Sequence, residues 1–277
     1  MSEAPPGLPV ITSKLNPLVK DFLALRRSAR RRRIEQLSLV EGFKILKLAL
    51  DAGSTPAVVL YSTAKMTDEE YLLLERARRQ GATVREVTEP VLTKVSAREG
   101  PLGCVASVRV AETDLSGLKL SPNPLLVVME GLEKPGNLGS LARTASAGGA
   151  DALITADSQT DIYSPATIHA SLGSVFDLPV VRCSTQECIP WLQSRGIEIV
   201  ATTPGAKSAY YELDLSGPVA LAIGNEHRGL SPAWLEAGTH ALIPMTGSMN
   251  SLNATIAGGI VLFEALRQRA VAEGSEA

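Results

Sequence analysis

Hydrophobic positions in the first fifty residues recur at three- and four-residue spacings, which is the period of an amphipathic helix. They predict helices between Asn16 and Asp51 that are interrupted near a run of arginines. A further helix is predicted over residues 68–80, because acidic residues occupy its first turn and basic residues its last. Three short apolar runs predict strands, at Val58–Tyr61, Thr83–Val87 and Cys104–Val110.

The second half of the chain alternates continuous apolar runs with glycine-rich turns and helical patterns. Helices are predicted from about Leu138 to Gly148 and from about Ser251 to Arg269. The apolar runs predict strands at Leu125–Met129, Ala152–Thr155, Pro179–Arg182, Glu198–Thr202, Val219–Ile223 and Ala241–Pro244. Strands that are apolar on both faces are typical of a parallel sheet covered by helices on both sides. The fold class predicted for this half is therefore α/β with a mainly parallel sheet.

A polar stretch with glycine, serine and proline, residues 114–124, separates these two patterns. It divides the chain into a smaller first domain and a larger second one. The expected organisation is a disordered tail at 1–9, a first domain at 10–112, a linker at 113–124, a second domain at 125–270 and a tail at 271–277.

The chain has 277 residues, of which 45% are hydrophobic and 20% charged, which suits one large domain or two of ordinary size. No apolar run approaches the roughly 18 residues that cross a bilayer, and the first ten residues lack the regions of a signal peptide. We therefore expect a soluble, cytoplasmic protein without a membrane partner. The three cysteines form no C-x-x-C pair, which argues against a disulfide framework and a structural zinc.

The net charge of −2 is unevenly distributed along the chain. Residues 1–120 carry 19 Lys+Arg and 14 Asp+Glu, whereas the remainder carries 8 and 15. The basic half contains Arg26, Arg27 and the run Arg30–Arg33, a density that can neutralise several phosphates. On charge alone two interpretations stay open, an acidic partner such as nucleic acid or a solvated helix face.

Several common active-site motifs are absent from the sequence. There is no G-x-x-x-x-G-K-[ST], no complete G-x-G-x-x-G, no G-x-S-x-G and no H-E-x-x-H. The three histidines, His169, His227 and His240, lie far apart in the sequence without a metal-ligand pattern around them. A phosphate loop, a hydrolase triad and a metal site are therefore not indicated.

Three polar, glycine-rich segments remain, residues 130–143, 224–231 and 243–255, and open α/β sheets bind ligands after their strands. The first is also compatible with a helix that Asn137 caps and that carries a surface arginine. The second also fits a strand-to-helix loop with Ser231 as N-cap. The third has more donors and acceptors than one helix cap requires, which indicates a bound ligand.

Taken together, the three segments resemble the SpoU, or TrmH, branch of the SPOUT class of RNA methyltransferases. PGNLGSLARTA is similar to the first motif of that family, IGNEHRGLS to its second and IPMTGSMNSLNATIAGGIVLFEALRQR to its third. DIYSPATIHASLGSVFDLPVV resembles the segment between the first two motifs. ITSKLNPLVKDFLAL and LVEGFKILKLAL resemble the family's N-terminal RNA substrate-binding domain, a ribosomal-protein-like α/β/α module. The resemblance covers nearly the whole chain.

The resemblance implies methyl transfer from S-adenosylmethionine to a ribose 2′-hydroxyl of RNA, with ribosomal RNA as the favoured substrate, in a domain with a trefoil knot. It also implies a homodimer through that domain, because the family completes its site across a two-fold interface. The last predicted helix offers an apolar face for such a dimer, made of Ile256, Ile260, Phe263 and Leu266 beside the small residues Ala257, Gly258 and Gly259.

By motif position, the resemblance assigns three sets of site residues and no metal. The catalytic set is Asn137, Arg143, Glu226 and Asn253. The cofactor-binding set is Thr202, Gly224, Asn225, Glu226, Gly229, Ile243, Met245, Ser251, Leu252 and Asn253. The RNA-binding set is Lys14, Asn16, Arg27, Arg30, Arg31 and Arg33.

These residue types suit methyl transfer to a hydroxyl. The sulfonium of the cofactor is already a good electrophile, so the protein has to align the hydroxyl and assist the loss of its proton. We expect Arg143 to clamp a phosphate and stabilise the oxyanion, since a guanidinium with a pKa above about 12 is a poor base. The sequence departs from the family pattern at Ser146, where aspartate is common, and at His169, where arginine is frequent. Ala254–Thr255 replaces a common Val-Ser pair.

Other functions stay open at this point. One is a non-catalytic RNA-binding protein, such as a ribosome assembly factor that keeps the fold without turnover. Another is a nucleotide-binding α/β domain for a different ligand, and a third is the same reaction on transfer RNA. The four catalytic-type residues in ordered motifs favour the methyltransferase.

Overall fold

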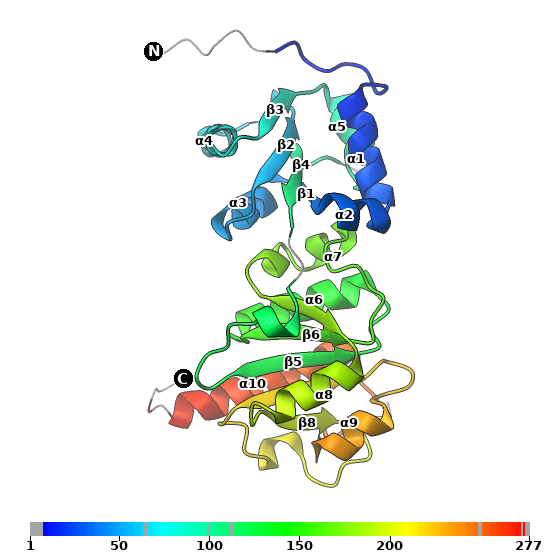
Figure 1. The fold of residues 1–277 in the computed structure, drawn as a ribbon, viewed down its shortest axis with the longest axis vertical. Helices are drawn as coiled ribbons and strands as arrows, with labels where there is room; N and C mark the ends of the chain where they lie inside the picture. Colours follow the sequence, from blue (N-terminus) through cyan, green and yellow to red (C-terminus); the bar gives the residue numbers. More distant parts are fainter. Residues whose placement is uncertain are drawn as a thin grey trace. The chain divides into compact units, whose positions relative to one another are not determined.

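The computed structural model describes residues 8–63, 66–98, 100–110, 113–248, 251–272 and 274. The chain forms two compact units, one of residues 1–111 and 163–177 and the other of residues 112–162 and 178–277. Each unit is built on its own β-sheet (Figure 1). The tails expected at 1–9 and 271–277 lie largely outside the described residues; Leu8, Pro9, Val271, Ala272 and Gly274 are described.

The first unit contains a mixed four-stranded sheet in the order β1-β4-β2-β3. Strand β4 is antiparallel to both of its neighbours, and β2 and β3 are parallel. The strands are β1 (Leu37–Glu41), β2 (Pro56–Tyr61), β3 (Thr83–Glu86) and β4 (Cys104–Arg109). The helices are α1 (Pro17–Arg27), α2 (Ala29–Glu35), α3 (Phe43–Asp51), α4 (Asp68–Arg79), α5 (Glu89–Val95) and α7 (Pro165–Ala170).

The N-terminal helical pattern hides a strand that sequence reasoning missed. Helix α2 ends at Glu35, because Gln36 adopts a left-handed conformation with φ 50°, and the chain then enters β1. Strand β1 is only five residues long, and its leucines also fit the three- and four-residue spacing of the preceding helices. The prediction of helices alone between Asn16 and Asp51 is therefore wrong, and a short edge strand lies between them.

The second unit contains a parallel six-stranded sheet in the order β10-β8-β9-β5-β6-β7, as the α/β prediction requires. Its strands are β5 (Leu125–Glu130), β6 (Ala152–Ala156), β7 (Val180–Cys183), β8 (Glu198–Thr202), β9 (Val219–Ile223) and β10 (Thr239–Ala241). Its helices are α6 (Pro135–Ala147), α8 (Thr185–Gln193), α9 (Pro232–Ala237) and α10 (Ala254–Ala272). Short 3-10 turns lie at Leu115–Gly117, Ser174–Phe176 and Tyr210–Glu212, the second of them in the first unit.

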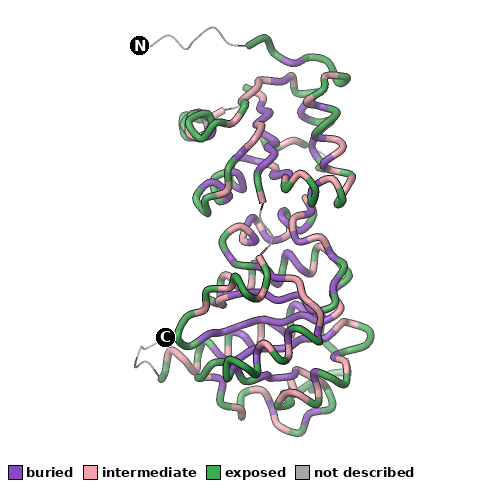
Figure 2. Tube along the Cα trace, viewed as in Figure 1, coloured by how far each residue is buried: buried purple, intermediate pink, exposed green. Residues whose placement is uncertain are grey.

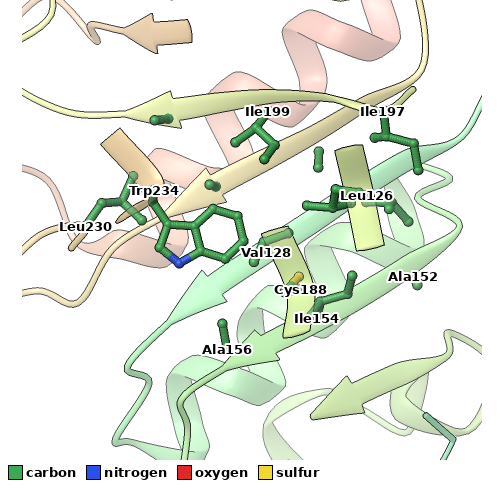
Figure 3. Packing of buried hydrophobic residues seen from close by; sticks show 14 of the residues in the cluster. Leu126, Val128, Ala152, Ile154, Ala156, Cys188, Ile197, Ile199, Leu230 and Trp234 are labelled. Carbon is green, nitrogen blue, oxygen red and sulfur yellow. The ribbon is translucent and has the colours of Figure 1, made fainter. Parts of the chain in front are cut away.

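Buried apolar residues follow the strands of both units (Figure 2). On one face of the parallel sheet, alternate strand residues such as Leu126 and Val128 pack with α8 and α9 around the fully buried Trp234 (Figure 3). Helices α6 and α10 cover the other face. Three leucines of segment 113–124, the expected linker, pack against the first of these faces: Leu115, Leu118 and Leu120. Among the described residues, no helix is long and apolar enough to cross a membrane.

Three element boundaries in this unit differ from those expected. Helix α6 begins at Pro135 rather than about Leu138, because proline suits the first helical turn. Strand β10 covers Thr239–Ala241 rather than Ala241–Pro244, since it pairs only with the last three residues of β8. Helix α10 begins at Ala254 rather than about Ser251.

Candidate active site at the carboxyl edge of the parallel sheet

The polar segments named above follow β5, β9 and β10, three parallel strands of one sheet. Their carboxyl ends therefore meet at the same edge, where open α/β sheets bind ligands. The segment after β5 leads into α6, the segment after β9 leads into α9, and the segment after β10 leads into α10.

Glu226 lies at the centre of the polar contacts at this edge. Its Oε1 accepts hydrogen bonds from Nδ2 of Asn137 at 2.6 Å and from Nδ2 of Asn253 at 2.8 Å. The ammonium of Lys134 lies 3.3 Å from its Oε2. The side chain of Glu226 is 22% exposed, so solvent reaches a carboxylate whose position is fixed by three partners. The structure thus unites one predicted residue from each of the three segments.

The orientation of Asn253 follows from its role at the start of α10. Its Oδ1 accepts a hydrogen bond from the backbone N–H of Thr255 at 2.9 Å, which is the contact of an N-cap residue. The amide oxygen is thereby committed to the helix, so the amide nitrogen faces Glu226. This cap also explains why α10 begins at Ala254.

Asn137 does not cap α6, contrary to the expectation from sequence. It lies inside the first turn, where its backbone N–H donates to the carbonyl of Lys134 at 3.1 Å. Lys134 is the N-cap residue and makes no side-chain cap hydrogen bond. The side chain of Asn137 is therefore free to donate to Glu226.

The loop after β9 is closed by its own backbone. Asn225 and Gly229 exchange two backbone hydrogen bonds, of 3.1 and 2.9 Å, and Gly229 has φ +69°. The side-chain Nδ2 of Asn225 also donates to the carbonyl of Gly131 at 2.8 Å. A Cβ on the buried Gly224 would lie 2.1 Å from the backbone carbon of Gly229. The loop's own backbone therefore excludes a side chain at Gly224, one of the expected cofactor-binding residues.

Glu130 is a polar residue at this edge that sequence reasoning missed. It is the last residue of β5, and its buried carboxylate accepts from the backbone N–H of Ser231 at 2.6 Å and from Oγ1 of Thr185 at 3.3 Å. Thr185 Oγ1 in turn accepts from Nε1 of Trp234 at 3.0 Å. Glu130 therefore holds the C-terminal end of the loop that carries Glu226. Ser231 precedes Pro232 at the N-cap position, as expected, but makes no side-chain cap hydrogen bond.

Arg143 lies on α6 with an exposed side chain and does not contact the Glu226 cluster. It has no hydrogen-bond or ion-pair partner among the described residues. An exposed guanidinium on the same helix as Asn137 is available to a ligand or a second subunit. The structure therefore brings three of the four predicted catalytic residues together and leaves the fourth unpaired.

The remaining predicted cofactor residues lie after β8 and β10. The Oγ1 of Thr202, at the end of β8, is buried and has no hydrogen-bond partner in the described part of the chain. Ile243, Met245, Ser251 and Leu252 belong to the segment after β10; the first is half-buried and the others are exposed. Within the described residues, positions 243–248 make no backbone–backbone hydrogen bond. Apolar side chains, free backbone donors and an unpartnered buried hydroxyl together suit a nucleoside-type ligand.

The predicted RNA-binding residues lie in the first unit and divide into two groups. Lys14, Arg27, Arg30 and Arg33 are exposed, and none has a partner among the described residues. The other two make internal contacts. Oδ1 of Asn16 accepts from the backbone N–H of Leu18 at 3.0 Å and so caps α1. Arg31 pairs with Glu35 at 2.5 Å and Asp21 at 2.9 Å, hydrogen bonds that raise the pKa of its guanidinium.

Two further arginines of the basic segment stabilise the fold. Nη1 of Arg32, a buried residue, donates to the carbonyls of Leu25 at 2.5 Å and Arg26 at 3.1 Å. Nη1 of Arg26 donates to the carbonyl of Ser96 and to that of Lys94 at 3.2 Å. These contacts satisfy the free carbonyls at the ends of α1 and α5. The basic run is thus partly structural, which charge counting does not reveal.

Comparison with protein families matches both halves of the chain. The SpoU rRNA Methylase family model matches residues 124–263, and the MRM3-like substrate binding domain model matches residues 16–106. The chain is 33% identical over 279 residues to the 23S rRNA (uridine(2479)-2′-O)-methyltransferase of Streptomyces viridochromogenes. The aligned region covers 96% of this chain and 95% of that protein.

Solved structures show the same likeness over nearly the whole chain. The crystal structure of an AdoMet-bound rRNA methyltransferase from Sinorhizobium meliloti has a TM-score of 0.86 and 34% sequence identity, and the match covers 94% of this chain and 97% of that one. The crystal structure of an RNA 2′-O ribose methyltransferase has a TM-score of 0.83 and 40% identity, with 94% and 98% coverage.

Proposed function

Because this chain belongs to the SpoU rRNA methylase family, we propose that it transfers the methyl group of S-adenosylmethionine to a ribose 2′-hydroxyl of ribosomal RNA. The observation that carries the proposal is the convergence of Asn137, Glu226 and Asn253 at one sheet edge. These residues come from three separate motifs, and a non-catalytic RNA-binding protein has no need to hold them together. A ribosomal RNA substrate supports a cytoplasmic location.

The cofactor would be held by the loops after β8, β9 and β10, through Thr202, the backbone of residues 243–245 and the side chain of Leu252. S-adenosylmethionine supplies a methyl group on a sulfonium, so the protein's own residues have only to bind and orient the acceptor and assist the loss of its proton. In that transfer the hydroxyl oxygen would gain the methyl group, the electron pair of the methyl–sulfur bond would stay on the sulfur, and the hydroxyl proton would pass to solvent water.

Glu226 holds two amides in position while one of its carboxylate sites stays open to the ribose. A carboxylate has about four lone-pair sites, and Asn137, Asn253 and Lys134 occupy three. The fourth can accept a hydrogen bond from the attacking hydroxyl, which aligns it for transfer. Arg143 is assigned to the phosphate and to the developing oxyanion, since its guanidinium cannot act as a base near neutrality.

We also propose a homodimer through α10. Ile256 is 56% exposed, Phe263 48% and Leu266 37%, and with the half-buried Ile260 they form one apolar stripe along the helix. The small residues beside the stripe have another role than the one expected. A Cβ on Gly258 would lie 3.0 Å from Leu141, and one on Gly259 would lie 3.3 Å from Thr144, so these glycines face α6 of the same chain. The stripe alone is therefore the partner surface.

The trefoil knot expected for this family is likewise a proposal for this chain. What supports it is the path of the C-terminal segment, which leaves edge strand β10 and returns as α10 to pack on α6 and on the interior strand β9.

Calorimetry and methyl mapping test the proposed function. We expect the chain to bind S-adenosylmethionine and not NAD, and to methylate ribosomal RNA in preference to transfer RNA at a ribose position. NAD binding without methyl transfer would favour a different nucleotide-binding protein. Cofactor-independent RNA binding without transfer would favour an assembly factor, and methylation confined to transfer RNA would correct the substrate.

A further inference from the structure

A recess of about 230 Å³ lies entirely within the unit of residues 1–111 and 163–177. Its inner wall is apolar and buried, and it includes Leu39 of β1, Ile45 of α3 and Ile168 of α7. Exposed residues surround the mouth, among them Ala166, Arg98 and His169. The recess is smaller than the roughly 300–1,000 Å³ of sites for drug-sized ligands, which suits one planar ring system.

Hydrogen bonds fix the loop that carries Arg98. The carboxylate of Glu41 accepts from Oγ of Ser96 at 2.6 Å and from the backbone N–H of Ala97 at 2.7 Å. Arg26 holds the carbonyl of Ser96 from the other side. The backbone next to Arg98 is therefore ordered before any ligand arrives, which lowers the entropic cost of binding.

The opposite wall is fixed as well. Ser38 Oγ donates to the carbonyl of Tyr163, just before α7. Ser164 caps α7 by accepting from the backbone N–H of Thr167 at 3.1 Å. The recess is thus bounded by two anchored segments rather than by free side chains.

Arg98 makes no ion pair with a carboxylate of the described residues, and Glu41, which also lines the recess, accepts hydrogen bonds from Ser96 and Ala97. Nη1 of Arg98 lies 3.2 Å from Nε2 and 3.4 Å from Nδ1 of His169. Because arginine only donates, a ring nitrogen of His169 is the acceptor in this contact. A phosphate is a better partner for a guanidinium than an imidazole nitrogen, because it carries the opposite charge and can accept two parallel hydrogen bonds.

We propose that this recess binds one unpaired nucleotide of the RNA substrate, with its base against Leu39, Ile45 and Ile168 and its phosphate on Arg98 and His169. The proposal rests on the proposed function, since RNA is the ligand. An unpaired nucleotide fits because a base has to leave its stack to enter an apolar recess. Arg98 supplies the phosphate contact and the recess supplies the base contact, so the two parts can be tested separately.

The test uses the full-length chain and a fluorescein-labelled single-stranded RNA of about twelve nucleotides, a length within the range of single-strand sites. Arg98→Gln should weaken binding about five- to tenfold and reduce the salt slope of log K by about 0.7, because one phosphate is no longer neutralised. Ala166→Phe should fill the mouth, weaken binding by a similar factor and leave the salt slope unchanged. Arg79→Gln is the matched control, because Arg79 is exposed on α4 of the same unit and does not line the recess.

The proposal is overturned if Arg98→Gln matches Arg79→Gln in both affinity and salt slope. It is also overturned if Ala166→Phe binds the RNA as tightly as wild type, since the recess then receives no base. Circular dichroism should show both variants folded, because both side chains are exposed. Methyl transfer to ribosomal RNA by the wild-type chain separates the two claims. If the wild-type chain transfers methyl groups and both variants bind RNA normally, only the recess proposal is rejected. If the wild-type chain transfers no methyl group, the proposed function is contradicted.

Discussion

Among single residues, Asn253 both caps a helix and contributes to the proposed active site. Its Oδ1 caps α10 and its Nδ2 donates to Glu226. Asn253→Ser should keep a capping oxygen and leave thermal stability near wild type, whereas Asn253→Ala should cost about 0.5–2 kcal/mol of unfolding free energy. Both should lose most methyl transfer, because neither can hold Glu226 through an amide. Denaturant unfolding and a transfer assay measure the two effects independently. Full activity in Asn253→Ser would show that the amide contact is dispensable.

Arg143 differs from Asn253 because it is exposed and has no hydrogen-bond or ion-pair partner among the described residues. Arg143→Ala should leave S-adenosylmethionine affinity and stability unchanged and lower kcat/KM by about a hundredfold or more, the pattern of a group that acts on the RNA ribose and phosphate. Calorimetry and steady-state kinetics give the two numbers. Parallel loss of cofactor binding and activity would mean that Arg143 belongs to the cofactor site instead.

The site residues differ in how far sequence could predict them. Asn137, Glu226 and Asn253 were found through motif resemblance, and the structure brings them into contact. The backbone of Gly229 fills the space that a Cβ on Gly224 would need, and no local sequence pattern signals this contact. Glu130 was missed because its partner Ser231 is 101 residues away, a pairing that no local pattern signals.

At the scale of elements, long apolar runs were predicted well and short or edge elements were not. Strands β8 and β9 match their expected bounds, since both are buried and flanked by turns. Strand β1 has a leucine spacing that also fits a helix, and β10 is an edge strand of three residues. Helix α10 begins three residues late, because Asn253 rather than Ser251 supplies the cap.

The basic segment of α1 and α2 divides into paired and unpaired arginines, and this predicts which of them bind RNA. Replacing Arg27, Arg30 and Arg33 together by alanine should weaken RNA binding across sequences. It should also lower the salt slope by roughly 0.7 to 0.9 for each phosphate that is no longer neutralised. Cofactor affinity should not change, because the cofactor loops belong to the other unit. Fluorescence anisotropy at several salt concentrations measures the slope.

Arg31→Ala provides the comparison within the same basic segment. Arg31 is already paired with Asp21 and Glu35, so this change should alter the salt slope less than any one of the other three. A triple variant with wild-type affinity and slope would show that this face of the helices is merely solvated.

At the scale of the whole molecule, two units divide the work of binding RNA and transferring the methyl group. Segment 163–177 follows β6 of the parallel sheet, yet it belongs to the unit that contains the N-terminal sheet. The sequence pattern predicts a single boundary at residues 113–124, which places segment 163–177 in the second domain, whereas the structure groups it with the first unit. The order of residues along the chain does not show to which unit such a segment belongs, because membership depends on the surface against which the segment packs.

The proposed homodimer depends on the exposed apolar stripe of α10. Phe263→Glu should place a charge in the apolar stripe of α10, convert the dimer to a monomer and reduce methyl transfer at least about tenfold, because a buried unpaired charge costs several kcal/mol. Light scattering coupled to size exclusion measures the mass. Leu72→Glu is the control, since Leu72 is 68% exposed on α4 and outside the stripe. A wild-type chain that is monomeric and fully active would remove the dimer from the account.

We propose that the cluster around Glu226 serves methyl transfer to ribose, and labelled methyl transfer by a Glu226 variant tests this role. Ribosomal RNA is incubated with methyl-labelled S-adenosylmethionine and either the wild-type chain or Glu226→Gln, then digested to nucleosides. Glu236→Gln, an exposed glutamate on α9, serves as the matched control. We expect label in a single 2′-O-methylnucleoside for wild type and Glu236→Gln, and about a hundredfold less for Glu226→Gln. Label on a base, or equal labelling by Glu226→Gln, would contradict this proposal.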